Sequence, residues 1–206
     1  MAVSKFKTNS LKTPLKYSSF LAGNDAYVPL AYDSITTSTV GGGGVASVTF
    51  SSIPATYTHL QVRYFAQTNR ATYGRDGIWI RFNSDSASNY SDHYLTGDGS
   101  TADAGANINA DRIYLPEVLT STAGANFFGS GIVDVLDYVN TSKYKTTRSI
   151  GGGDHNGTVN SIGAQVSLRS GAWRSTSAIN SITFYPGSGT TISQYSKFAL
   201  YGIKGA

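Results

Sequence analysis

From Ser34 onward, hydrophobic and polar residues alternate with a period of two over several short segments. In THLQVRYFAQ, the alternation places Leu60, Val62 and Tyr64 on one side of an extended chain. GIWIRFN alternates in the same way. Because successive side chains of a strand point to opposite faces of a sheet, this period predicts half-buried antiparallel strands.

Clusters of Gly, Asn, Asp and Ser separate further segments of this type. Their number and spacing predict about eight to ten strands in two sheets, as in a β-sandwich. A jelly-roll wrap is the first choice of topology, because the connecting loops are long and a final strand lies at the C-terminus. The additional predicted strands lie in RIYLPEVL, ANFFGSGIVDVLDY, KYKTTRSIGG, VNSIGAQVSL, INSITFYPG and KFALYGIKG.

The glycine run Gly41–Gly44 separates two alternating segments. It predicts a hairpin or a strand–loop–strand connection. A phosphate-binding loop is a weak alternative, because such loops lead into a helix or a Lys-Ser/Thr pair, and the sequel VASVTF has neither.

Residues 1–33 do not follow the alternating pattern, and Pro14 and Pro29 favour extended backbone there. We therefore predict an extended N-terminal arm at 1–33 and an all-β sandwich, jelly-roll-like, at 34–206. The arm combines basic and large apolar side chains: Lys5, Phe6, Lys7, Leu11, Lys12, Leu15, Lys16, Tyr17 and Phe20.

Composition narrows the classes of protein that fit. The 206 residues suit one β domain, and Gly 23 and Tyr 14 with a single Glu favour strands and tight turns. The absence of Cys excludes disulfides, thiolate catalysis and Cys-ligated zinc. No apolar run reaches the length of a membrane span or a signal peptide. We expect a protein that is made in the cytoplasm and either stays there or leaves the cell by lysis or inside a particle.

The net charge of +4 belongs to the arm. Residues 1–24 contain four Lys and no acid, and the remaining residues carry 12 basic and 12 acidic side chains. A domain that binds nucleic acid needs a basic face on the fold itself. The distribution therefore favours an acidic protein surface as the partner of the arm.

Candidate catalytic and metal-binding groups are few. His59, His93 and His155 lie in different segments, and His155 with the adjacent Asp154, in a glycine-rich turn, is the candidate for a metal pair. Such a turn is the usual composition of a surface loop, and a metal pair is the weaker interpretation.

Paired carboxylates are the other enzymatic possibility, as in glycosidases. Asp134 and Asp137 lie three positions apart, an odd number that sets them on opposite faces of a strand, and the only Glu is Glu117. We therefore predict no catalytic residues, no metal and no cofactor.

Trp79 and Trp173 are the remaining candidates. Trp79 lies on the strand face opposite Ile78 and Ile80. Most aromatic residues of the chain are expected in the core or on the sheet surface. Exposed rings bind sugars or pack in subunit interfaces, and the sequence leaves these possibilities open.

Several motifs resemble a family of small structural proteins encoded by tailed phages, especially phages of aquatic bacteria and cyanobacteria. They are FLAGNDAYVP, SSIPATYTHLQVRY, IRFNSDSASNY, VLDYVNTSKYKTTRS, WRSTSAINSITFYPGSG and YSKFALYGIKG. The resemblance covers nearly the whole chain.

This resemblance implies a β-rich virion protein, usually trimeric, without catalytic residues or cofactors. We expect a head decoration (cement) protein on the outer surface of the phage head, with the major capsid protein and its own copies as partners, and neither nucleic acid nor membrane. The alternative is a tail or fibre component that binds carbohydrate on the host surface.

Overall fold

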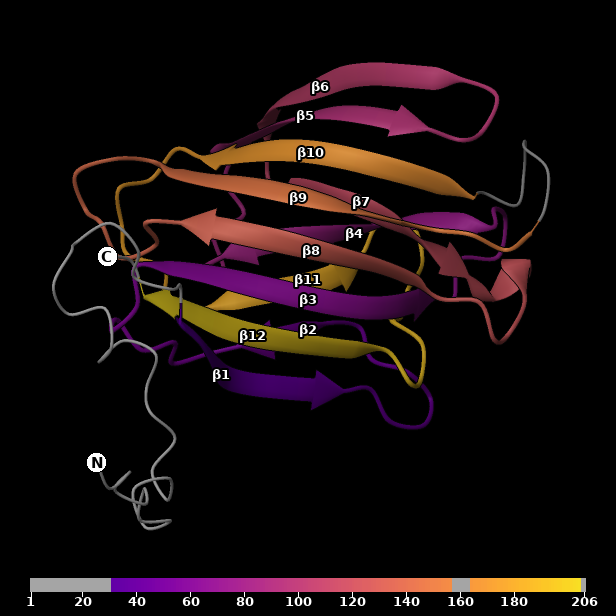
Figure 1. Cartoon of the computed structure of the whole chain (residues 1–206), viewed down its shortest axis with the longest axis horizontal. Coiled ribbons are helices and arrows are strands. Elements are labelled where there is room, and N and C mark those ends of the chain that lie inside the picture. Colours follow the sequence, from indigo (N-terminus) through magenta and orange to yellow (C-terminus); the bar gives the residue numbers. More distant parts are fainter. Residues whose placement is uncertain (1–30, 157–163, 205–206) are drawn as a thin grey trace, which may run out of the picture.

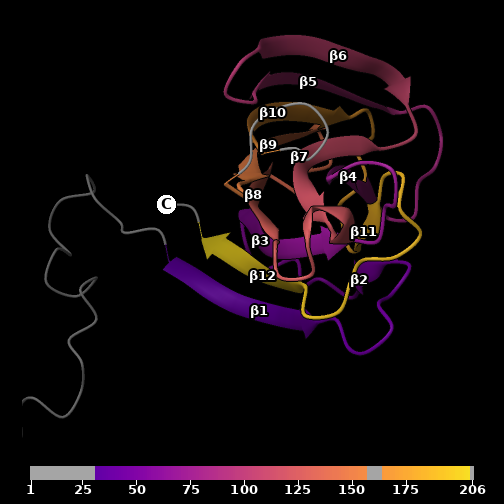
Figure 2. The ribbon, with the colours of Figure 1, turned by 90° about the vertical axis from the view of Figure 1, so that its right-hand side faces the viewer.

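The computed structural model describes residues 31–156 and 164–204, and these form two facing layers of β-strands (Figures 1 and 2). The larger layer, the large sheet, is antiparallel throughout. In spatial order it contains β1 (Ala31–Thr39), β12 (Lys197–Lys204), β3 (His59–Thr68), β8 (Gly129–Leu136), β9 (Lys145–Gly153), β10 (Gln165–Trp173), β5 (Tyr90–Gly97) and β6 (Ala102–Ala110).

The second layer, the small sheet, has four antiparallel strands. Their order is β2 (Val48–Phe50), β11 (Ile182–Pro186), β4 (Arg75–Phe82) and β7 (Ile113–Thr120). A short parallel pairing, Gln67 with Leu119 and Thr68 with Thr120, joins β3 to β7 at one side of the sandwich. A single turn of 3₁₀ helix, η3 (Ser121–Ala123), follows β7.

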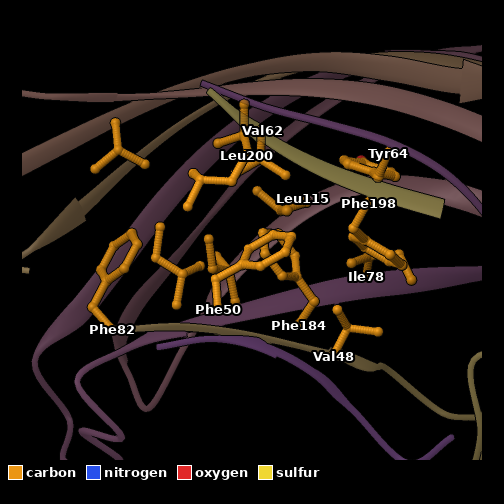
Figure 3. Packing of buried hydrophobic residues seen from close by; sticks show 14 of the residues in the cluster. Val48, Phe50, Val62, Tyr64, Ile78, Phe82, Leu115, Phe184, Phe198 and Leu200 are labelled. Atoms are coloured by element: carbon orange, nitrogen blue, oxygen red, sulfur yellow. The ribbon is translucent and has the colours of Figure 1, made fainter. Parts of the chain in front are cut away.

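Strand alternation produces the core between the sheets (Figure 3). In β4, Asp76, Ile78, Ile80 and Phe82 are buried, and the residues between them are partly exposed. The facing strands of the large sheet contribute residues of the same kind, including the stacked Tyr64 and Phe198 rings, and the core cluster extends across both sheets. Burial of these side chains is the main favourable contribution to folding.

The predicted all-β sandwich is confirmed, and the described chain has 12 strands rather than eight to ten. Successive strands move between the sheets: β1, β3, β8 and β12 lie in the large sheet, and β2, β4, β7 and β11 lie in the small sheet. This order is compatible with the jelly-roll wrap, which stays a prediction. β1 already includes residues 31–33, which the sequence analysis placed in the arm.

Two strands, β5 and β6, escaped the sequence analysis. β6 reads ADAGANINA, a composition of small and polar residues with low strand propensity. It forms a strand because β5 provides a pairing partner over Gly97 to Tyr90. Together they lengthen the large sheet at the edge opposite β1 (Figure 1).

Gly41–Gly44 connects β1 to β2, which lie in different sheets. Of the two predicted arrangements, strand–loop–strand is therefore confirmed and the hairpin is wrong. Within the described ranges, no helix is long and apolar enough to cross a membrane.

Candidate interaction surface

The outer face of the large sheet carries a line of four aliphatic side chains on adjacent strands. Ile132 of β8 pairs with Ile150 of β9, Ile150 with Leu168 of β10, and Leu168 with Leu95 of β5. We call these four residues the aliphatic row. The line runs perpendicular to the strands, along the direction of the interstrand hydrogen bonds.

The aliphatic row faces away from the core because its residues have the outward parity of their strands. In β8, Val133 and Val135 point inward and are fully buried, whereas Ile132, directly before Val133, points outward and is 37% exposed. Ile150, Leu168 and Leu95 are 53%, 49% and 55% exposed. Single exposed apolar residues are ordinary, but contiguous ones mark interaction surfaces.

Two further apolar residues border the row one step along the strands. Val166 of β10 is 60% exposed, and Phe65 of β3 is 47% exposed. The Phe65 ring stacks on Phe128, with 4.7 Å between ring centroids. The apolar surface therefore continues from β3 to β5.

A groove of about 880 Å³ lies along this side of the row. Ile132, Ile150 and Val166 contribute apolar lining, and Arg63, Asp98 and Asp154 contribute charged groups, so apolar and charged groups share one surface. Glycines form much of its floor: Gly97, Gly99, Gly131, Gly151, Gly152 and Gly153.

Packing requires glycine in this part of the sheet, as Gly131 and Gly152 illustrate. A Cβ on Gly131 would lie 2.3 Å from the ring of the buried Tyr64, whose hydroxyl donates to the Pro116 carbonyl. Gly152 has φ 153°, which other residues rarely adopt, and a Cβ there would lie 1.9 Å from the Gln165 carbonyl oxygen. At both positions, contacts within the sandwich therefore exclude a larger side chain.

The outer face of the small sheet also carries a row across neighbouring strands, but it is aromatic. Tyr185 of β11 pairs with Trp79 of β4, and Trp79 pairs with Tyr114 of β7. The ring centroids are 5.7 Å and 5.2 Å apart, both in edge-on arrangements. We call these three residues the aromatic row.

Charged side chains cover the aromatic row. The guanidinium carbon of Arg112 lies 3.9 Å from the centroid of a Trp79 ring, and that of Arg81 lies 5.0 Å from the Tyr185 centroid. Asp111 forms ion pairs with both arginines. Burial raises the pKa of Tyr185 to about 12, which fits a shielded phenol. The Trp79 ring is therefore already occupied by an intramolecular cation–π contact.

Trp173 requires a correction, because it does not face solvent. The side chain is 2% exposed, packs against Phe82 and Tyr90, and donates its Nε1 hydrogen to Asp85 at 2.7 Å. Its strand parity places it inside the sandwich. It is a core residue and is neither a sugar-facing nor an interface side chain.

The candidate carboxylates have basic or amide partners. Asp134 accepts from Gln61 at 2.8 Å and from Arg148 at 3.1 Å. Asp137 forms an ion pair with Lys143, whose hydrogen bond lowers the pKa of this carboxyl group. Glu117 forms an ion pair with Arg75 at 2.9 Å and accepts from Gln165. These contacts tie each carboxylate to neighbouring strands and loops.

The three histidines lie apart in the fold. The Nδ1 of His59 accepts from the Asp137 backbone N–H at 2.9 Å, so its role there is to fix the end of β8. His93 is exposed on β5, and the ring of His155 meets the edge of Phe127. The described residues contain no group of three or more His, Asp or Glu side chains arranged to hold a metal.

The predicted docking residues of the arm, from Lys5 to Phe20, lie outside the described residues. The aliphatic row was missed by the sequence analysis. Its members occur in four segments with ordinary alternation, and only the pairing register brings them into one line.

Comparisons with models of protein families, with curated proteins and with solved structures gave no match.

Proposed function

We propose that this protein is a structural component of a tailed-phage virion, a decoration protein that binds the outer surface of the capsid as a homotrimer and stabilises the head lattice. The sequence motifs that resemble small phage structural proteins support the virion assignment. No comparison tests that resemblance, so it enters as part of the proposal.

The observation that carries the proposal is the exposed aliphatic row with its glycine-floored groove. Covering an exposed surface of Ile, Leu and Val side chains with another protein lowers the free energy, because apolar surface is removed from water. A protein whose work is to hold other subunits together needs such surfaces.

The arm provides a second contact in this proposal. Its four Lys residues fit an acidic capsid exterior, and its five large apolar residues add burial. Because exposed charges are screened by salt and apolar contacts are not, the two contributions can be separated experimentally.

The groove favours a second candidate function, a tail or fibre component that binds host-surface carbohydrate. It is open, and its carboxylates Asp98 and Asp154 could accept hydrogen bonds from sugar hydroxyls. This candidate no longer rests on the tryptophans, because Trp173 is buried and Trp79 is covered by Arg112.

The test adds full-length protein and a variant without residues 1–24 to undecorated capsids, followed by counting of bound copies per shell. We expect the full chain to decorate and the truncated chain to bind at least tenfold more weakly. Changing the four Lys to Gln should flatten the salt dependence of attachment. Changing Phe6, Leu11, Leu15, Tyr17 and Phe20 to Ser should weaken attachment at every salt concentration.

Equal decoration by both forms would overturn the role of the arm. If neither form binds heads and both bind tails or cells, the carbohydrate-binding alternative replaces the decoration proposal. Copy number in virions gives an independent reading, since hundreds of copies indicate the head and a handful indicates the tail.

A further inference from the structure

We infer that the aliphatic row packs against the same row of identical chains, along the symmetry axis of the assembly. This inference rests on the self-association included in the proposed function, and it assigns that association to a surface: the outer face of β8, β9, β10 and β5.

The first argument is the amount of apolar surface. Six side chains of the row and its border are each at least 37% exposed. Their exposed parts amount to several hundred Å², comparable with the largest apolar patch of a typical monomer at about 300–600 Å². A standard interface buries about 800 Å² per partner, so the row and the groove floor supply much of what one stable contact needs. The six residues are Phe65, Leu95, Ile132, Ile150, Val166 and Leu168.

The second argument is charge. On a symmetry axis each side chain meets its own copies, so a charged residue there would face like charge. The four positions of the row carry no charge. Among the residues paired one step below it, Asp134 and Arg148 neutralise each other through an ion pair at 3.1 Å. Arg63 of β3, which pairs with Ile132, is a charged residue at the end of the row. The four apolar positions themselves offer no complement to a strongly acidic or basic partner, whereas the same four positions of an identical chain fit them.

The third argument is shape. Leu and Ile have the same number of side-chain atoms, so the row presents four knobs of equal size at the spacing of adjacent strands, about 4.8 Å. Because the paired positions follow one another along the direction of the interstrand hydrogen bonds, an axis along the row brings each residue opposite its own copies. The four positions then form four successive layers, with Ile132 in the first layer and Leu95 in the last.

The aromatic row of the small sheet does not offer the same surface. Arg112 and Arg81 lie over its rings, and Asp111 joins them, so contact with another chain would first have to displace ion-paired groups. The described part of the chain covers the aromatic row and leaves the aliphatic row uncovered.

The first experiment measures the oligomeric state of the full chain by sedimentation equilibrium. We expect Ile150→Lys and Leu168→Lys each to weaken self-association by roughly 100-fold or more, because a buried unpaired charge is strongly unfavourable. The matched control is Tyr144→Lys, which changes a side chain that is 58% exposed outside the row. The control should associate like the wild type.

The second experiment tests whether a residue of the row lies next to its own copy in another chain. The chain contains no Cys, so Leu168→Cys introduces a single thiol. A short bis-maleimide should join this thiol to its copy in another chain in high yield, and Tyr144→Cys should give little product under the same conditions. Circular dichroism checks that each variant is folded, and Leu95→Lys and Leu95→Cys replace any variant that is not.

The inference is overturned if the wild type is monomeric at high concentration, or if the row variants associate like the control. If the wild type is a dimer and Leu168→Lys makes it monomeric, the result would support the assigned surface and contradict the homotrimer of the proposed function. A monomeric row variant that still decorates capsids would leave the capsid-binding proposal intact. Capsid binding and self-association are thus tested separately.

Discussion

The two outer faces of the sandwich differ in whether side chains of the same chain cover their apolar residues. Each carries a row of apolar side chains in register across neighbouring strands, Tyr185, Trp79 and Tyr114 on the small sheet and the aliphatic row on the large sheet. On the small sheet, guanidinium groups of the same chain lie over the rings. On the large sheet, the aliphatic side chains remain about half exposed.

The difference shows that apolar content alone does not identify an interaction surface. A row covered by its own chain contributes to the stability of the monomer. An uncovered row contributes little until a partner covers it. Substitutions in the aromatic row of the small sheet should therefore lower the free energy of unfolding. Substitutions in the aliphatic row of the large sheet should weaken self-association.

The largest expected effect is on the covered face. Trp79→Ala should lower the free energy of unfolding by about 2–3 kcal/mol, because the ring contacts Tyr114, Tyr185 and Arg112 and its loss leaves a cavity beneath the guanidinium group. Leu168→Ala should change the free energy of unfolding by less than about 0.5 kcal/mol. Urea denaturation at concentrations where the chain is monomeric measures both. Equal losses would remove the distinction between the two faces.

A smaller effect is expected from the carboxylate that joins the two arginines. Asp111→Asn should lower stability by roughly 1–2 kcal/mol at pH 7, since it removes the charge that both guanidinium groups contact. Burial alone would raise the pKa of Asp111, but hydrogen bonds from Arg112 and Arg81 outweigh it and hold the pKa below its ordinary value.

The sign of the pH dependence follows from this lowered pKa. The stabilisation is fully present above the unfolded pKa of about 3.9 and is lost as the pH falls through the folded value. Wild type and Asp111→Asn should therefore differ at pH 7 and converge below pH 4. A difference that stays constant across this range would show that packing, rather than charge, is responsible.

Much of the fold was predictable because alternation is a local signal. The strands in THLQVRYFAQ, GIWIRFN and KFALYGIKG were recognised from single segments, and β3, β4 and β12 contain them. β6 was not predictable in this way, because the Ala, Asn and Gly residues of ADAGANINA become a strand only through pairing with β5.

The surfaces depended on information that a single segment does not contain. Parity placed Trp79 on an outer face correctly, but only the structure brings Arg112 over its ring. Trp173 ends β10 on the inward side, where it fills space between Phe82 and Tyr90. The aliphatic row needs the register of four strands from residues 95 to 168, and composition carries no trace of that register.

The salt dependence of self-association should distinguish an apolar contact from a contact made by ion pairs. Because the four positions of the row are uncharged, self-association should change less than about twofold in Kd between 0.1 M and 1 M NaCl, although the screening length falls from ~10 to ~3 Å. The Leu168→Lys variant gives the contrast, since salt should partly restore its association by screening the repulsion between the introduced charges. Strong weakening of the wild type by salt would instead place ion pairs at the centre of the contact.

The smallest expected effect is the most diagnostic for the uncovered row. Leu168→Lys should change the free energy of unfolding of the monomer by no more than about 0.5 kcal/mol, because the side chain is already half exposed and a Lys stem covers similar surface. At higher protein concentration the two proteins should diverge, since association stabilises the folded chain by mass action. The melting temperature of the wild type should then rise with concentration, and that of Leu168→Lys should not. A variant that is equally destabilised at every concentration would show that Leu168 supports the monomer, as Trp79 does, and the contrast between the two faces would fail.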